Sequence, residues 1–231
     1  MKHKDVVIYF YFIRHGESEG NLRPDLIGGR SPSVHLSERG IAQAKALGIR
    51  FLDEGVHFDQ FFVSSLSRAV ETANEIFSAM GKPVDEIKLV NEIIEFSQGE
   101  WEGKPRNKIY TIENLSYINS KGFLFIPPNG ESQRMVQRRV TEWLEDKILY
   151  NDEFLGKTMP LHIGIVAHGI VLKTLFHYIL RFDDRFIWRF KLDNCSISKF
   201  LFKKEGWFPL CINDSGHLHQ IGKLPGLHTE K

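Results

Sequence analysis

Two histidines, each followed by glycine, stand directly after apolar runs of the chain. His15 follows residues 6–13, an unbroken run of β-branched and aromatic residues, with Arg14 between them. His168 follows the shorter apolar run 163–167. Runs of this kind are typical of buried parallel strands. Ligands of open α/β sheets lie outside the carboxyl ends of such strands, so we expect both histidines in one site.

The chemistry that these residue types favour is attack on phosphorus. A neutral imidazole is a nucleophile when an acceptor holds its other ring nitrogen. A phosphoryl group carries up to two negative charges, so several fixed cations or donors must surround it. Arg14 suits phosphate oxygens, and Arg68 lies just past the strand-like run 58–64. We therefore expect His15 as nucleophile, with Arg14, Arg68 and His168 around the phosphoryl group.

Taken singly, these residues have ordinary alternatives. An arginine such as Arg68 is more often a surface residue of a helix. His168 fits an interior histidine at the end of a strand as well as it fits a functional one. Their shared position after apolar runs is what favours a common site.

A leaving group also needs a proton, and glutamates are concentrated in one short segment. They alternate with apolar side chains, which favour the protonated form of a carboxyl that packs against them. Such clusters are more often solvated loop charge, and the residues alone leave the choice of acid open. The four candidates are Glu92, Glu95, Glu100 and Glu102.

Strand and helix signals alternate along the chain and predict a three-layer α/β/α sandwich with a mostly parallel central sheet. We expect one domain over residues 1–231, a small cap-like insertion at about 96–130 above the active-site face, and a mobile tail over 213–231. The predicted strands are 6–13, 58–64, 86–90, 163–167, 196–202 and 207–212; the predicted helices are 37–51, 66–80, one within 105–117, 132–149 and 170–180.

Composition excludes several classes of protein. Thirty Lys and Arg against 29 Asp and Glu give a net charge of +1, without the basic excess of a nucleic-acid-binding protein. No apolar run approaches the ~20 residues that span a bilayer. The two cysteines make neither a disulfide framework nor a zinc signature. We expect a cytoplasmic protein without membrane or nucleic-acid partners, and its oligomeric state is left open.

Several ordered motifs together resemble the histidine phosphatase superfamily, in the phosphoglycerate mutase-like branch. This branch holds cofactor-dependent phosphoglycerate mutases, broad-specificity phosphatases and the fructose-2,6-bisphosphatase domain. The matching motifs are Arg14-His15-Gly16-Glu17-Ser18 with Asn21, Leu36-Ser37 with Gly40 and Gln43-Ala44, Ser64-Ser65-Leu66-Ser67-Arg68-Ala69 with Thr72-Ala73, residues 95–99, Trp101-Glu102-Gly103, Asn129-Gly130-Glu131-Ser132, Ala167-His168-Gly169 and Asn194-Cys195-Ser196-Ile197.

The resemblance implies a role for each of these residues. His15 would form a phosphohistidine and Glu95, four residues before the Gly-x-Trp-Glu-Gly segment, would be the general acid. No metal and no cofactor are implied. The groups that would bind the phosphorylated metabolite are Arg14, Arg68, His168 with Gly169, the amide of Asn21, and Gly28 at the pocket entrance.

The resemblance by itself leaves two activities possible, because the branch contains both mutases and phosphatases. The pattern typical of the mutases has a tryptophan before the asparagine that corresponds to Asn21, whereas this chain has Gly20 there. The mutases also carry a long basic insertion after the acid, whereas the corresponding segment here, residues 104–128, is short. The pair Gly28-Gly29 suggests an open, adaptable rim. We therefore expect a metal-independent phosphatase of small phosphate monoesters. The alternatives are a 2,3-bisphosphoglycerate-dependent phosphoglycerate mutase and a non-catalytic protein that binds a phosphorylated ligand.

Overall fold

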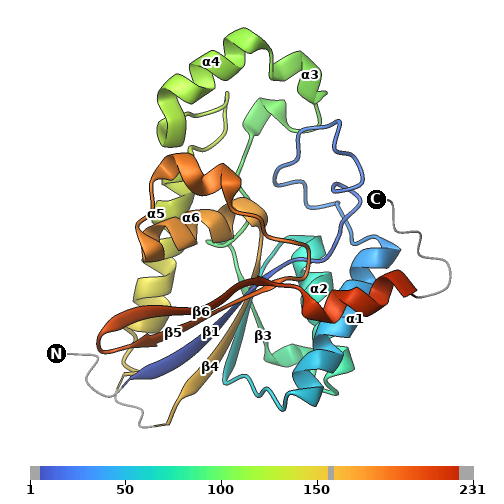
Figure 1. The fold of residues 1–231 in the computed structure, drawn as a ribbon, viewed down its shortest axis with the longest axis vertical. Coiled ribbons are helices and arrows are strands. Elements are labelled where there is room, and N and C mark those ends of the chain that lie inside the picture. The colour runs from blue at the N-terminus through green and yellow to red at the C-terminus, as the bar shows by residue number, and fades with distance from the viewer. Residues whose placement is uncertain (1–5, 156–158, 224–231) are drawn as a thin grey trace.

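A six-stranded sheet separates two layers of helices, as the alternating pattern predicts (Figure 1). The computed structural model describes residues 6–155 and 159–223. The sheet order is β3-β2-β4-β1-β5-β6; the first four strands are parallel, and β5 and β6 are antiparallel to their neighbours. The strands are β1 (Val7–Arg14), β2 (Gln60–Ser64), β3 (Ile87–Val90), β4 (Leu161–Ala167), β5 (Ile197–Lys203) and β6 (Gly206–Asp214).

Both faces of the central strands are buried, which explains why β1 is apolar at every position before Arg14. Alternate side chains of a strand point to opposite faces. Phe10 and Phe12 pack into the core beneath α5 and α6, whereas Tyr11 and Ile13 pack into the core beneath α1 and α2. The covering helices are α1 (Glu38–Asp53), α2 (Ser67–Ala79), α5 (Gln133–Leu144), which continues into a π-helical turn η4 (Glu145–Leu149), and α6 (Gly169–Leu180).

Local capping signals place the helix starts. The hydroxyl of Ser37 accepts from the Gly40 N–H at 3.0 Å and begins α1. The hydroxyl of Ser132 accepts from the Met135 N–H at 3.1 Å and begins α5. These are the positions at which a serine that replaces a missing backbone acceptor is most favourable.

The segment 96–130 differs from the prediction of one helix within 105–117. It contains two helices, α3 (Arg106–Ile109) and α4 (Ile112–Lys121), together with the short turns η2 (Gly99–Trp101) and η3 (Gly122–Leu124). The chain breaks helical geometry at Tyr110, with φ −89° and ψ 57°. Thr111 then caps α4 by accepting from the Asn114 N–H at 3.2 Å. Both helices lie at the top of the molecule in Figure 1.

Residues 213–223, which we expect to belong to a mobile tail, are folded in the structure. β6 continues to Asp214, and the 3-10 helix η6 (Gly216–Lys223) packs against α1. Arg50 of α1 donates to the Asp214 carboxylate at 2.7 Å, which ties the segment to the fold. Residues 224–231 lie outside the described part of the chain. Within the described residues, no helix combines the length and apolar character needed to cross a bilayer.

The loop after β1 lies backbone to backbone against the first turn of α1. A Cβ atom added to Gly40 would stand 1.9 Å from the carbonyl oxygen of Glu17. One added to Gly16 would stand 2.7 Å from the carbonyl oxygen of Gly40. Such distances leave no room for a side chain, so this glycine contact sets the path of the chain just after His15.

Gly40→Ala should therefore destabilise the protein even though alanine is the better helix former by ~1 kcal/mol. Overpacking of this kind commonly costs about 1–3 kcal/mol, measured as the change in free energy of unfolding by urea. Leu52→Ala, at a position of α1 that is 56% exposed, is the matched control and should stay within about 0.5 kcal/mol. Equal stability of the Gly40→Ala variant and the parent would contradict the tight contact.

Candidate active site

A cavity of about 660 Å³ opens at the carboxyl ends of the parallel strands. Its volume lies in the range of small-molecule sites. Arg14 at the end of β1, the adjacent His15, and Arg68 in the first turn of α2 line it, together with Glu95. The structure thus brings Arg14, His15 and Arg68 to one cavity, although Arg68 is more than 50 positions away in the chain, as expected of residues that follow parallel strands.

The ring of His15 is held by its own loop. Its Nδ1 lies 2.7 Å from the carbonyl oxygen of Gly16, so Nδ1 carries the proton and donates it to that acceptor. Only 3% of the residue is exposed. Burial, with Arg68 and Arg14 nearby, holds the pKa of His15 well below its usual value. The imidazole is therefore neutral near pH 7, with the lone pair on Nε2.

His168, directly after β4, is the second histidine of the site. Its ring centre lies 5.0 Å from that of His15, and its Nε2 lies 2.7 Å from the hydroxyl of Ser64 at the end of β2. Burial, and then the neighbouring His15, hold the pKa of His168 well below its usual value. Its Nδ1 is buried without a hydrogen-bond partner among the described residues.

The two arginines are anchored by backbone carbonyls. Arg14 donates from Nη1 to the carbonyl of Leu192 at 2.6 Å, and its Nε is buried without a partner in the described structure. Arg68 donates from Nη2 to Gly29 at 3.0 Å and from Nη1 to Ser31 at 3.3 Å. Burial lowers the pKa of both guanidinium groups. A guanidinium still stays protonated, so two fixed positive charges face the cavity beside His15.

The glycine pair at the entrance is not uniformly open. A Cβ on Gly28 would meet nothing within 4 Å, but one on Gly29 would stand 2.0 Å from the carboxyl carbon of Glu102. Glu102 also accepts from the Arg30 N–H at 3.0 Å. The Glu102 carboxylate and Arg68 hold the loop at Arg30 and Gly29, so of the two glycines only Gly28 borders open space. A Cβ on Gly169 would stand 3.7 Å from Arg14 Nε, an ordinary van der Waals contact, so the guanidinium lies against the start of α6.

Asn21 lines the same cavity. Its Oδ1 accepts from the backbone N–H of Ser18 at 3.0 Å, from the Ser18 hydroxyl at 3.1 Å and from Asn194 Nδ2 at 3.1 Å. Three donors on Oδ1 leave Nδ2 as the group that can donate to a ligand. Asn194 also donates to the carbonyl of His15 at 3.1 Å. Sequence reasoning assigned no individual role to Asn194, although the motif 194–197 pointed to it.

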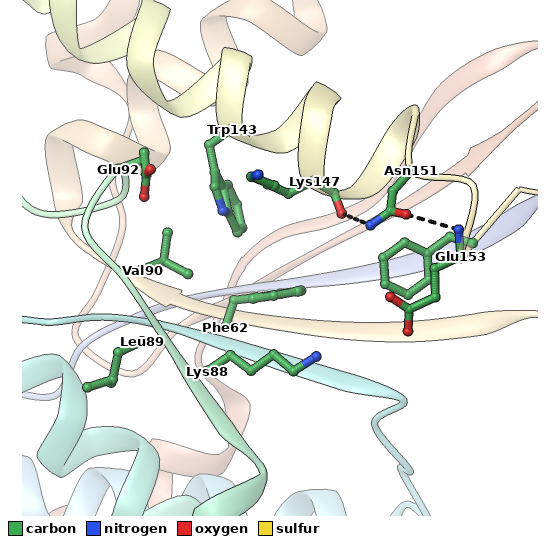
Figure 2. Close-up of a pocket in the computed structure, with 10 residues that line it drawn as sticks. Phe62, Lys88, Leu89, Val90, Glu92, Trp143, Lys147, Asn151 and Glu153 are labelled. Atoms are coloured by element: carbon green, nitrogen blue, oxygen red, sulfur yellow. Dashed lines mark hydrogen bonds between the residues drawn. The ribbon is translucent and has the colours of Figure 1, made fainter.

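The glutamates of the 92–102 segment go to different places. Glu95 lines the cavity that contains His15, as does Glu102. Glu92 is exposed and lines a separate cavity of about 320 Å³, where it lies with Val90, Phe62 and Trp143 (Figure 2). The site therefore includes Glu95 and excludes Glu92.

Several side chains at the cavity had no signal in the sequence. Ile170 in the first turn of α6 and Trp188 in the 3-10 helix η5 (Asp184–Arg189) both line it. Trp188 is 62% exposed. Nothing in its local sequence distinguishes Trp188 from other surface aromatic residues, because it is far in sequence from His15 and reaches the cavity only through the folding of the chain. Among the described residues, no group of three or more His, Cys, Asp or Glu side chains is arranged to hold a metal ion.

Comparison with known proteins agrees with this geometry. A family model described as histidine phosphatase superfamily (branch 1) matches residues 10–215. The 2,3-bisphosphoglycerate-dependent phosphoglycerate mutase of Bartonella tribocorum is 30% identical over 169 residues, which cover 71% of this chain and 77% of the mutase.

Solved structures of similar fold include phosphatases. The α-ribazole phosphatase of Shigella flexneri is 27% identical, with a TM-score of 0.73 and coverage of 90% of this chain and 96% of that one. The phosphoserine phosphatase of Entamoeba histolytica, solved with 3-phosphoglyceric acid, is 25% identical, with a TM-score of 0.74 and coverage of 91% and 99%. Fold, site and family model agree over nearly the whole length, and the chain belongs to the histidine phosphatase superfamily, branch 1.

Proposed function

We propose that the protein is a metal-independent phosphatase that hydrolyses small phosphate monoesters through a phosphohistidine on His15. The observation that carries the proposal is the hydrogen bond from His15 Nδ1 to the Gly16 carbonyl. It leaves the Nε2 lone pair as nucleophile on a cavity that two guanidinium groups line. The other ring nitrogen is thereby held by an acceptor, as nucleophilic catalysis by histidine requires.

The reaction has two halves. His15 Nε2 attacks phosphorus and the ester P–O bond breaks, while Glu95 gives its proton to the departing alcohol oxygen. A water molecule then attacks the phosphohistidine, Glu95 takes a proton from that water, and the P–N bond breaks to release phosphate. One carboxyl thus serves as acid and then as base.

The surrounding groups suit a charged, five-coordinate phosphorus. Arg14 and Arg68 supply fixed positive charge, and preorganised charge of this kind is usually the largest single contribution to catalysis. The unpartnered Nε of Arg14 and Nδ1 of His168 are buried polar atoms that call for a partner. Phosphoryl oxygens are acceptors that would satisfy donors at these positions.

His15→Ala should abolish turnover of an aryl phosphate, because no other nucleophile replaces the imidazole. The fold should survive, since His15 lies in a loop after β1 and outside both apolar cores. The measurements are phosphate release and acid-labile phosphate on the protein after quenching, with His57→Ala, an exposed position, as control. Full activity of the His15→Ala variant would contradict the proposed mechanism. If the parent protein itself releases no phosphate, a non-catalytic binding protein would be favoured.

Glu95→Gln should lose ~10²–10⁴ in rate on an alkyl phosphate, because an alkoxide leaves poorly without a proton. The loss should be much smaller on 4-nitrophenyl phosphate, whose leaving group needs little protonation. Glu92→Gln is the matched control, since Glu92 is exposed and lines the other cavity. If Glu92→Gln is the impaired variant instead, the acid is misassigned.

A phosphoglycerate mutase is the second candidate, favoured by the name of the Bartonella relative. A mutase must retain the dephosphorylated intermediate and exclude water, whereas a phosphatase releases it. This chain has Gly20 rather than tryptophan before Asn21, and its 104–128 segment is short and carries few bases. The phosphatases of similar fold match over at least nine-tenths of both chains. These observations support hydrolysis of a small phosphorylated metabolite.

An assay of 3-phosphoglycerate with 2,3-bisphosphoglycerate separates the two candidates. We expect free phosphate to form from 3-phosphoglycerate or from sugar phosphates, with little 2-phosphoglycerate, because the intermediate can leave. The products are quantified in one time course with the His15→Ala variant as blank. Rapid formation of 2-phosphoglycerate with negligible phosphate would establish the mutase and overturn the phosphatase.

A further inference from the structure

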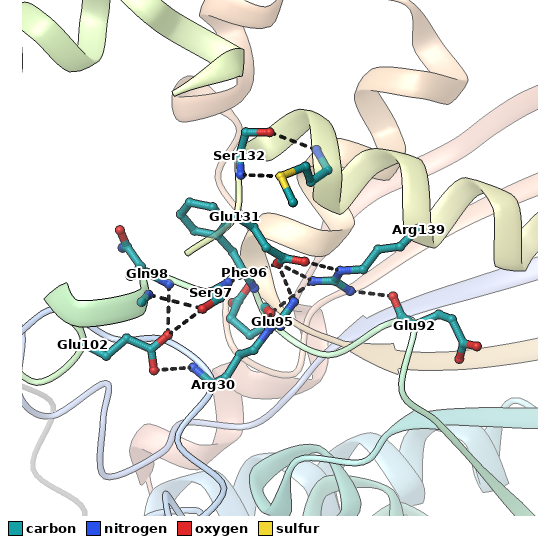
Figure 3. Close-up of polar contacts among 12 residues, drawn as sticks. Arg30, Glu92, Glu95, Phe96, Ser97, Gln98, Glu102, Glu131, Ser132 and Arg139 are labelled. Carbon is teal, nitrogen blue, oxygen red and sulfur yellow. Dashed lines mark hydrogen bonds and ion pairs between the residues drawn. The ribbon is translucent and has the colours of Figure 1, made fainter. Parts of the chain in front are cut away.

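Two guanidinium groups hold the backbone of the segment that carries Glu95. Arg30, from the loop after β1, donates from Nε to the Glu95 carbonyl oxygen at 2.7 Å. Arg139 of α5 donates from Nη2 to the same oxygen at 3.1 Å and from Nη1 to the Glu92 carbonyl at 2.5 Å. Figure 3 shows both side chains converging on this short stretch. Arg139 thus contacts the segment at two carbonyls, three residues apart.

A single partly buried carboxylate, that of Glu131, fixes both arginines. Arg139 donates to its two oxygens at 3.1 and 3.2 Å, and Arg30 donates to Oε2 (Figure 3). Glu131 also contacts Ser97: its N–H donates to the Ser97 carbonyl at 2.9 Å, and its carboxylate accepts from the Ser97 N–H at 3.3 Å. Burial alone would raise the pKa of Glu131, but the ion pairs with Arg139 and Arg30 bring it below its usual value. The carboxylate therefore stays charged and holds the guanidinium groups of Arg30 and Arg139 in place.

The guanidinium groups contact the main chain at Glu95, whereas the Glu95 carboxyl accepts from the Phe96 N–H at 2.8 Å. Contact with the carbonyl fixes the position of the residue through its main chain, and the side chain of Glu95 is left to reach into the cavity. The arrangement thus restricts the geometry of proton transfer, to which rates are sensitive.

We propose that Arg139 is a positioning residue that acts through Glu95, with Glu131 and Arg30 as the groups that orient its guanidinium. The inference rests on the proposed function, in which Glu95 protonates the leaving oxygen. Arg139 is not among the described residues that line the His15 cavity, so we expect it to act on the step that Glu95 performs.

The test is leaving-group dependence in Arg139→Gln. We expect kcat on an alkyl phosphate to fall on the order of 10–100-fold, the scale of a misplacement of about 1 Å, with at most a few-fold loss on 4-nitrophenyl phosphate. Arg138→Gln is the matched control, because Arg138 is adjacent, its side chain is 77% exposed, and within the described part of the chain it pairs with Glu142 along the helix. It should leave both rates unchanged.

The double variant Glu95→Gln/Arg139→Gln separates positioning from a general structural role. If Arg139 acts through Glu95, the double variant should be no slower on the alkyl phosphate than Glu95→Gln alone. Equal losses on both substrates, or losses that multiply in the double variant, would overturn the proposal.

Arg139→Lys keeps a positive charge beside Glu131 but lacks the fork that reaches both carbonyls, so it preserves the test if Arg139→Gln fails to fold. It should show the same leaving-group dependence as Arg139→Gln, with thermal unfolding close to the parent. A lysine variant with parent rates on both substrates would also overturn the proposal. If Glu95→Gln itself shows no leaving-group dependence, the proposed acid fails, and the inference about Arg139 fails with it.

Discussion

A neutral imidazole can attack phosphorus only through a ring nitrogen that carries no proton, and the carbonyl of Gly16 decides which nitrogen that is. At 2.7 Å it accepts from His15 Nδ1 and leaves the Nε2 lone pair available. The carbonyl can do so because the loop after β1 follows one path, pressed against Gly40 where no side chain fits. The buried strand before His15 and the helix after the loop therefore act on the same hydrogen bond.

Two buried guanidinium groups beside this histidine are costly unless their donors find acceptors. Backbone carbonyls of Leu192, Gly29 and Ser31 supply those acceptors. The same positive charges disfavour protonation of His15 and His168. Burial and, to a lesser extent, these positive charges keep both imidazoles neutral, so charge that suits a phosphoryl ligand also supports the neutral form of the proposed nucleophile.

The wall that carries Glu95 uses the opposite arrangement of charge. There a carboxylate, Glu131, lies between two arginines and neutralises part of their charge. The arginines then donate to carbonyls of the chain between β3 and α5. Arg14 and Arg68 thus line the cavity, whereas Arg30 and Arg139 hold a loop.

Outside segment 96–130 and the C-terminal 3-10 helix η6, the local pattern of residues by itself determined the strands and main helices of the fold. An unbroken apolar run before Arg14 predicts a strand buried on both faces, and serines at 37 and 132 predict the starts of two helices, because these signals act over a few residues. The same argument placed Arg14, His15, Arg68 and His168 at the ends of strands that must share an edge of the sheet.

Only the tertiary structure decided which residues meet across long separations. Glu92 and Glu95 are both glutamates next to apolar residues in the same short segment, yet they line different cavities. The contacts of Arg30 and Arg139 with Glu95 join residues 65 and 44 positions apart, and Asn194 reaches His15 from 179 positions away. The packing of residues 213–223 on α1 is equally remote. Periodicity and caps carry no information about such contacts, because they depend on how the layers pack and not on which residues are adjacent in the chain.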